Sequence, residues 1–258
     1  MAALFRRLRA SSEDTMFMGW TMRLAWRLAL SRLTDGRKPV KLILETTRLC
    51  NSHCLTCDMW REPPGPEIHP DQLLRAISTV AENVSWVALT GGEVTLYPHL
   101  RYLVAGLVSR CPNLLLINIP LNGINPGRTA GLIGQLAREN KRVLLHATVS
   151  IDGIGGDQDK LRGAGQWKQT IATWEKLQIL RRQHKNLRIS AQMTVSRLNA
   201  GKSCQVMERF AKESDTFIVA FGMDNRFYRV DGASAREPVP YAAQLISNRH
   251  RVTGNGPV

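Results

Sequence analysis

The feature that most constrains the fold of this chain is a regular alternation of strand-length apolar runs with helix-like segments. Strands are predicted at 41–46, 86–90, 114–119, 143–150, 188–195 and 216–221. Helices are predicted between them, near 70–84, 98–110, 128–140, 167–184 and 201–213. Such alternation favours one parallel sheet with right-handed crossovers, and near-continuous Val, Ile and Leu runs favour burial of both sheet faces. Six units are too few for a closed eight-stranded barrel, so the sequence predicts an α/β fold, a partial (β/α)6 TIM-like barrel.

An N-terminal extension over residues 1–36 precedes this pattern and indicates a helix, most clearly over 15–33. Helical periodicity predicts one apolar stripe of Phe17, Trp20, Leu24 and Leu28, and a roughly opposite stripe of Met22, Trp26, Leu30 and Leu33. A helix with two apolar stripes has two surfaces to cover. Either it is wedged between two parts of the same protein, or one stripe docks on the barrel. In the second case the other stripe meets a partner or makes peripheral contact with a membrane interface.

The chain therefore divides into a helical extension over 1–36, a core barrel over 37–222 and a C-terminal tail over 223–258. The tail is polar and rich in Arg, Gly and Pro, with one weak helical stretch near Tyr241–Ser247, which is typical of a segment that is partly disordered or truncated. No apolar stretch has the roughly 18 residues that a membrane-spanning helix needs. The odd number of cysteines, five, does not fit a paired extracellular framework. We expect a cytoplasmic protein, with membrane association through the N-terminal helix as a further hypothesis.

Three of the five cysteines lie on one short loop after the first predicted strand, as Cys50, Cys54 and Cys57 in the spacing C-x3-C-x2-C. Thiolates select zinc, copper(I) or iron–sulfur clusters. A structural zinc site needs four ligands, usually in two separated pairs, and His53 is a poor fourth ligand because it directly precedes Cys54. Three cysteines leave one coordination position open, which favours a [4Fe–4S] cluster with one uniquely ligated iron. Spacing alone leaves zinc as an alternative.

Polar residues and glycines also follow the other predicted strands, at the sheet edge where parallel α/β folds bind ligands. They are Gly91, Gly92 and Glu93 after the second strand, Asn122 and Gly123 after the third, Ser150, Asp152 and Arg162 after the fourth, and Gln192, Thr194 and Asn199 on or after the fifth. Adjacent glycines permit close backbone approach or positive φ. A carboxylate beside them can accept hydrogen bonds from an ammonium group.

Over residues 41–222 these motifs, in this order, resemble the radical S-adenosylmethionine (radical SAM) enzymes. The cysteine loop corresponds to the cluster-binding loop of that family, and Gly91-Gly92-Glu93 to the segment that holds the amino group of the cofactor. Ser150-Ile151-Asp152-Gly153, followed by Leu161-Arg162-Gly163, is similar to a stretch common in the branch of peptide-modifying and pterin-forming enzymes.

The resemblance implies two cofactors, a [4Fe–4S] cluster on Cys50, Cys54 and Cys57 and S-adenosylmethionine bound to its fourth iron. Glu93 would accept from the cofactor's ammonium group, the Gly91-Gly92 backbone would lie against its methionine part, Ser150 would help to position it and Arg162 would pair with its carboxylate. Asp152 would contact polar cofactor groups or cap its turn, and Gln192 is a further candidate cofactor-binding residue. The implied reaction is reductive cleavage of S-adenosylmethionine to a 5′-deoxyadenosyl radical that abstracts hydrogen from an unidentified substrate.

Three positions depart from the family pattern. Thr56 stands where an aromatic residue often precedes the third cysteine, Val94 where proline often follows Gly-Gly-Glu, and Gln158-Asp159 where a His-Asp pair is common. Trp60 or Met59 could cover adenine in place of the missing aromatic residue, with core packing as the alternative. The tail has no cysteines for auxiliary clusters.

The formal charge of +14 favours acidic partners. The resemblance makes an acidic flavodoxin- or ferredoxin-type electron donor the expected partner, steered by charge. A nucleic-acid partner is disfavoured because no basic stretch is interleaved with aromatic residues. Two other hypotheses stay open: a non-enzymatic zinc- or cluster-binding module, and a truncated, inactive radical SAM fold. The substrate cannot be read from the fold.

Overall fold

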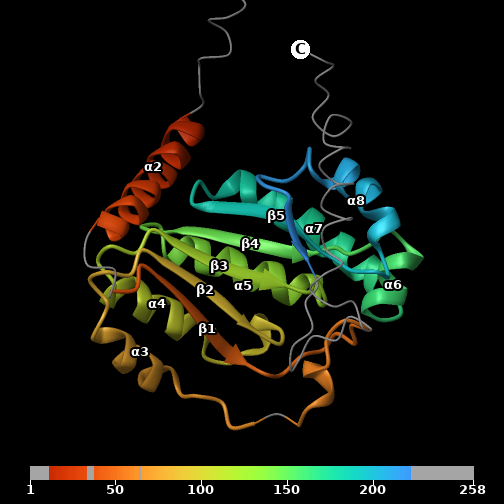
Figure 1. Cartoon of the computed structure of the whole chain (residues 1–258), viewed down its shortest axis with the longest axis horizontal. Coiled ribbons are helices and arrows are strands. Elements are labelled where there is room, and N and C mark those ends of the chain that lie inside the picture. The colour runs from red at the N-terminus through yellow and green to blue at the C-terminus, as the bar shows by residue number, and fades with distance from the viewer. Residues whose placement is uncertain (1–11, 34–37, 64, 222–258) are drawn as a thin grey trace, which may run out of the picture.

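The computed structural model of this chain describes residues 12–33, 38–63 and 65–221, and its centre is one six-stranded sheet (Figure 1). The strands are β1 (Lys41–Thr47), β2 (Trp86–Gly91), β3 (Leu116–Leu121), β4 (Leu144–Ser150), β5 (Leu187–Val195) and β6 (Ile218–Phe221). Neighbouring strands are parallel, and their order in the sheet is their order in the sequence. Within the described residues β1 and β6 are unpaired edges, so the fold is the open partial barrel that the alternation predicts.

The predicted crossover helices are present between successive strands. They are α3 (Pro70–Ser78), α4 (Leu100–Arg110), α5 (Pro126–Glu139), α7 (Gln166–Gln183) and α8 (Ser203–Phe210). Pro70 occupies the first turn of α3, as predicted, but the helix ends at Ser78 rather than near 84 because the following turn carries Val84 into the core. A further helix, α6 (Gly156–Arg162), was not predicted from the sequence; it follows Gly155, which has a positive φ of 60°. Short 3-10 helices add η2 (Met59–Arg61), η3 (Val94–Leu96) and η4 (Ala200–Lys202).

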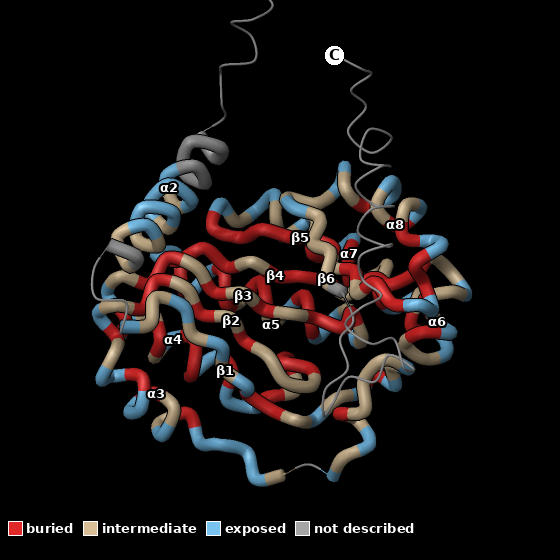
Figure 2. Tube along the Cα trace, viewed as in Figure 1, coloured by how far each residue is buried: buried red, intermediate tan, exposed pale blue. Residues whose placement is uncertain are grey.

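Buried and half-buried residues alternate along β2 and β3 (Figure 2). Alternate residues such as Val87, Ile117 and Leu145 belong to the buried core shared with the crossover helices. On β2 and β3 the residues between them are only half-buried. The prediction that both faces are buried is therefore wrong for the concave face of these two strands.

A row of hydrogen-bonded side chains crosses the concave face. The Trp86 indole N–H donates to Asn118 Oδ1 at 3.0 Å, Asn118 Nδ2 lies 3.3 Å from His146 Nδ1, and His146 Nε2 lies 2.7 Å from Ser190 Oγ. A donating amide at Nδ1 leaves Nε2 as the protonated nitrogen of a neutral imidazole. Burial lowers the pKa of His146, which also favours the neutral ring.

The N-terminal extension contains α2 (Ser12–Leu33), in agreement with the predicted helix, and α2 lies at the end of the barrel where the strands begin (Figure 1). Within the described residues no helix is both long enough and apolar enough to cross a membrane. Residues 1–11 of the predicted extension, the tail 223–258 with its weak helix near 241–247, and the side chains of Phe17 and Leu33 lie outside what the structure describes.

Candidate functional site

The cysteine loop leaves the carboxyl end of β1 and is held against the C-terminal end of α6. His53 N–H donates to the carbonyl of Arg162 at 3.1 Å, and Leu55 N–H donates to the carbonyl of Leu161 at 2.8 Å. The loop is thereby attached to a segment more than a hundred residues later in the chain. Its shape depends on α6 as well as on its own sequence.

The thiols of Cys50, Cys54 and Cys57 are free and half-buried. Burial raises the pKa of Cys50 to about 11 and also raises the pKa of Cys57, and charge on Cys54 raises both further. The three sulfurs therefore lie within electrostatic reach of one another. Among the described residues, no three Cys, His, Asp or Glu side chains already stand in the arrangement of a bound metal ion.

The residues around the loop fit a three-thiolate cluster better than a four-ligand zinc ion. The exposed ring of His53 packs edge-on against Trp60, with 4.7 Å between ring centroids, and Cys111 is buried at the end of α4. Neither supplies a fourth ligand to the loop. Three soft donors with an open position match the iron–sulfur alternative.

Trp60 and Met59 were the candidates to replace the missing aromatic residue beside Cys57. Met59 is buried in the structure, and the Trp60 indole N–H donates to the carbonyl of Cys54 at 3.2 Å. Both residues belong to η2. Met59 packs in the protein interior, and Trp60 stabilises the cysteine loop through its hydrogen bond.

Gly91 and Gly92 lie against the backbone that leads into the cysteine loop. Gly91 has a φ of 129°, and a Cβ at that position would overlap the carbonyl oxygen of Thr47. A Cβ at Gly92 would overlap the carbonyl oxygen of Leu49. The same approach forms two hydrogen bonds of 2.8 Å, from Gly92 N–H to Thr47 and from Glu93 N–H to Leu49. The glycines therefore join β2 to the loop, a role that the sequence analysis did not identify.

Glu93 is 2% exposed, and its carboxylate has three donors from the chain. Oε1 accepts from the backbone N–H and hydroxyl of Thr95 at 3.2 and 2.7 Å, and Oε2 accepts from the backbone N–H of Asn122 at 2.7 Å. Burial raises the pKa of Glu93, while these donors and the charge of Arg162 oppose the rise. Oε2 has a second lone pair available to a further donor.

Asn122 links the ends of three strands and is a site residue that motif matching left without a role. Its side-chain amide donates to Asn51 Oδ1 at 2.7 Å, and its carbonyl accepts from Gln166 Nε2 at 3.1 Å. Gln166 also lies 2.9 Å from the hydroxyl of Ser52. The position of Asn122 directly after a predicted strand was the available signal, but its partners are brought together only by the fold.

Arg162 is the basic group of the site, and it lies between Asp152 and the cysteine loop. Its Nε donates to Asp152 Oδ2 at 2.7 Å, and its Nη1 lies 3.8 Å from the sulfur of Cys54. Burial by itself lowers the pKa of Arg162, but the negative charges of Asp152 and Cys54 outweigh this effect and raise it. The Ser52 hydroxyl approaches the same sulfur at 3.1 Å.

Gln158 holds the turn that carries Ser150 and Asp152. Its carbonyl oxygen accepts from the backbone N–H groups of Asp152 and Gly153 at 2.8 and 3.1 Å, and its amide donates to the carbonyl of Ser150 at 3.1 Å. The glutamine that departs from the family pattern is thus a structural part of this turn. Asn199 adds a hydrogen bond of 3.0 Å to the carbonyl of Asp152.

The structure gathers most of the predicted site residues into one neighbourhood. Cys50 and Arg162 both lie within electrostatic reach of Glu93, and Asp152 is bound directly to Arg162. Gln192 lies on β5 opposite Ser150, and its carbonyl accepts from Ile151 N–H at 2.8 Å. Its side chain makes no hydrogen bond to any residue that the structure describes.

Comparison with known proteins gives one family match. The model of the radical SAM superfamily matches residues 44–187. A comparison with curated proteins returned no match.

Several solved structures share the fold. Streptococcus suis SuiB bound to S-adenosylmethionine is 12% identical with a TM-score of 0.64, over 87% of this chain and 51% of SuiB. The protein anSMEcpe with bound AdoMet is 16% identical with a TM-score of 0.61, over 83% of this chain and 62% of that protein. TYW1 with a lysine–pyruvate adduct is 15% identical with a TM-score of 0.51, over 86% of this chain and 81% of TYW1. This chain spans about half the length of SuiB.

Proposed function

Because this chain belongs to the radical SAM superfamily and is therefore an enzyme, we propose that it cleaves S-adenosylmethionine reductively at a [4Fe–4S] cluster. Membership implies an iron–sulfur cluster and S-adenosylmethionine as cofactors. The observation that carries the proposal is the junction of the cysteine loop, Glu93 and Arg162 at the carboxyl edge of the sheet. We include in this proposal that the segment from Ser150 to Arg162 resembles the corresponding stretch of the peptide-modifying and pterin-forming branch.

Cys50, Cys54 and Cys57 would hold three irons of the cluster. When bound, the cluster would supply the one-electron reduction needed to cleave the sulfur–C5′ bond of S-adenosylmethionine. The chain's own contribution begins at Cys54, whose sulfur has Ser52 and Arg162 beside it. A guanidinium beside a thiolate stabilises the charged, metal-binding form of the sulfur.

Binding of S-adenosylmethionine would use polar groups that the fold holds in place. Glu93 Oε2 would accept from the cofactor's ammonium group beside its existing bond to Asn122 N–H. Arg162 would use guanidinium nitrogens other than Nε, which is bound to Asp152, to pair with the carboxylate. The Ser150 hydroxyl makes no hydrogen bond to a described residue and would position the cofactor. Gln192 is proposed as a further contact from β5.

The electron donor would be an acidic flavodoxin- or ferredoxin-type protein. The charge of +14 favours such a partner. Two exposed cations lie near the cysteine loop: Arg61 follows the loop in the sequence, and Lys160 lies on α6, which holds the loop. Two matched structures were solved with peptides, SuiB with its precursor peptide SuiA and anSMEcpe with the Kp18Cys peptide. Peptides are therefore the first substrate class to test.

Anaerobic reconstitution with iron and sulfide tests this proposal. We expect a brown protein that forms 5′-deoxyadenosine from S-adenosylmethionine and dithionite, and a Cys54→Ala variant that loses both colour and product. Colourless protein with stoichiometric zinc would refute the proposal in favour of a non-enzymatic module. A cluster without cofactor cleavage would favour an inactive radical SAM fold.

A further inference from the structure

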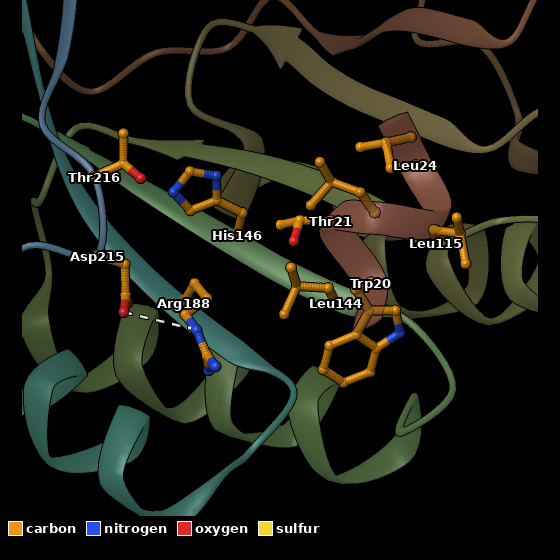
Figure 3. A pocket seen from close by; sticks show the side chains of 10 residues that line it. Trp20, Thr21, Leu24, Leu115, Leu144, His146, Arg188, Asp215 and Thr216 are labelled. Carbon is orange, nitrogen blue, oxygen red and sulfur yellow. Dashed lines mark ion pairs between the residues drawn. The ribbon is translucent and has the colours of Figure 1, made fainter. Parts of the chain in front are cut away.

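The inner face of α2 anchors this helix to the end of the barrel where the strands begin. Trp20 and Leu24 line a cavity of about 130 Å³ together with Leu115 and Leu144 (Figure 3). The guanidinium of Arg27 donates to Ser85 Oγ at 3.1 Å and to the carbonyl of Glu82 at 3.0 Å. These contacts set the position of α2 without using its other apolar stripe.

The outer face of α2 presents two large apolar side chains to solvent. Met22 is 67% exposed and Trp26 is 65% exposed, one helical turn apart. Only Ile43 on β1 is comparably exposed among the large apolar residues that the structure describes. Arg23 lies beside this pair on the helix and is also exposed. Within the residues that the structure describes, Met22 and Trp26 are therefore the uncovered part of the outer stripe, and the alternative of a helix wedged between two parts of the protein stays a hypothesis.

The same end of the barrel is basic. Exposed cations stand in the loops that precede the strands, namely Lys38 before β1, Lys141 and Arg142 before β4, Lys185 before β5 and Lys212 before β6. The exposed acidic residues of these loops are Glu82 and Glu213. Together with Arg23 there are six exposed cations and two exposed carboxylates at this end, and this excess of positive charge would attract an anionic surface.

From this combination we propose that the outer face of α2 docks on an anionic lipid bilayer. Trp26 and Met22 would enter the boundary between headgroups and acyl chains, where the amphipathic indole ring is favoured. Arg23 and the basic loops would lie at the level of the lipid phosphates. α2 would lie in the plane of the interface, in keeping with its lack of a membrane-spanning apolar stretch.

Docking would leave the proposed active site facing away from the bilayer. α2 contacts the beginnings of the strands, whereas the cysteine loop and Glu93 follow the ends of β1 and β2. Membrane contact is therefore a separate property of this chain and does not depend on its radical chemistry. Vesicle binding can be measured on protein without a cluster.

Co-sedimentation of the full chain with vesicles tests the proposal. We expect binding to phosphatidylglycerol–phosphatidylcholine vesicles, with much weaker binding to pure phosphatidylcholine and weaker binding at high salt. The double variant Met22→Ser/Trp26→Ser should bind at least tenfold more weakly. The matched control Ile179→Ser/Leu198→Ser removes two side chains that are 48% and 46% exposed outside α2, and it should bind like wild type.

Three results would overturn the proposal. The first is no binding of the wild-type chain to anionic vesicles, and the second is equal loss in the α2 variant and the control. The third combines two observations: the wild-type chain does not bind vesicles, and the α2 variant has half the molar mass of wild type in light scattering. That result would show that the stripe contacts a second copy of the chain. Circular dichroism of each variant would establish that it is folded.

Discussion

The guanidinium of Arg162 forms a buried ion pair with Asp152, with 2.7 Å between Nε and Oδ2 and with side chains that are 11% and 4% exposed. Asp152 Oδ1 also accepts from the backbone N–H of Thr194 at 2.7 Å. The pair therefore joins α6, the turn after β4 and strand β5. Through the carbonyl of Arg162 it also supports the cysteine loop.

Removing one partner of this ion pair should be more damaging than removing both. Arg162→Gln leaves the Asp152 carboxylate buried without its counterion, which we expect to reduce the free energy of unfolding by about 3–5 kcal/mol. The double variant Asp152→Asn/Arg162→Gln should recover more than half of this loss. Urea unfolding of the cluster-free protein measures both. Additive losses in the double variant would show that the two side chains do not interact.

Glycine at position 92 should be required by the backbone of the cysteine loop. Gly92→Ala places a methyl group on the carbonyl of Leu49, so the loop must move and we expect a loss of about 2 kcal/mol or more together with poor cluster retention. Gly127→Ala is the matched control, because no atom lies within 4 Å of the added Cβ in α5. That control should be neutral or stabilising by up to about 1 kcal/mol. Thermal unfolding and iron content separate the two variants, and equal behaviour would contradict the prediction.

Two threonines of α7 should respond oppositely to the same substitution. Thr170 and Thr173 are both fully buried, but Thr170 Oγ1 has no hydrogen-bond partner among the residues that the structure describes, whereas Thr173 Oγ1 donates to the carbonyl of Gly123 at 2.6 Å. Thr170→Val should be neutral or stabilising by about 1 kcal/mol, because it removes an unsatisfied polar group. Thr173→Val should destabilise by about 1–2 kcal/mol. Denaturant unfolding measures the difference, and a more damaging Thr170→Val would show that its hydroxyl has a partner in solution.

His146 should make stability depend on pH. Burial lowers the pKa of His146 in the folded state below its ordinary 6.5; the charge of Asp215 opposes this shift, and Arg188 adds a smaller lowering effect. The unfolded chain therefore binds the proton more readily, and the contribution of the neutral ring is complete above about pH 6.5 and decreases as pH falls below it. The melting temperature of the cluster-free protein should drop more steeply from pH 7.5 to 5.5 for wild type than for His146→Gln. A similar slope for both would oppose the prediction, and exposed His69→Gln is the control.

Glu93 should act mainly on S-adenosylmethionine rather than on the cluster. Glu93→Gln replaces a carboxylate oxygen with a donor and removes the charge proposed to meet the cofactor's ammonium group. We expect at least tenfold weaker binding of S-adenosylmethionine to the reconstituted protein, with unchanged iron content. Equilibrium dialysis measures affinity, and exposed Glu82→Gln serves as the control. Wild-type affinity in Glu93→Gln would remove this residue from the proposed cofactor site.

The sheet was predictable because it rests on local sequence patterns. Each strand begins within two residues of its predicted position, since apolar runs of strand length are bounded by polar turns. α6 was missed because its seven residues follow a glycine-rich turn and include no apolar periodicity long enough to indicate a helix. The half-buried concave face was not predicted because Ala88 and Leu116 are apolar residues, and their incomplete burial depends on the open barrel.

The sequence by itself determined the positions of the strands, the three-cysteine loop and the polar residues at the strand ends. Only the tertiary structure decided which of these residues meet. Ser52 and Arg162 are 110 positions apart, and Asn122 and Glu93 are 29 apart. Contacts over such separations arise from strand register and helix packing, which no local pattern encodes. For the same physical reason the two stripes of α2 were visible in the sequence, whereas their opposite environments were set by the packing of one stripe on the barrel.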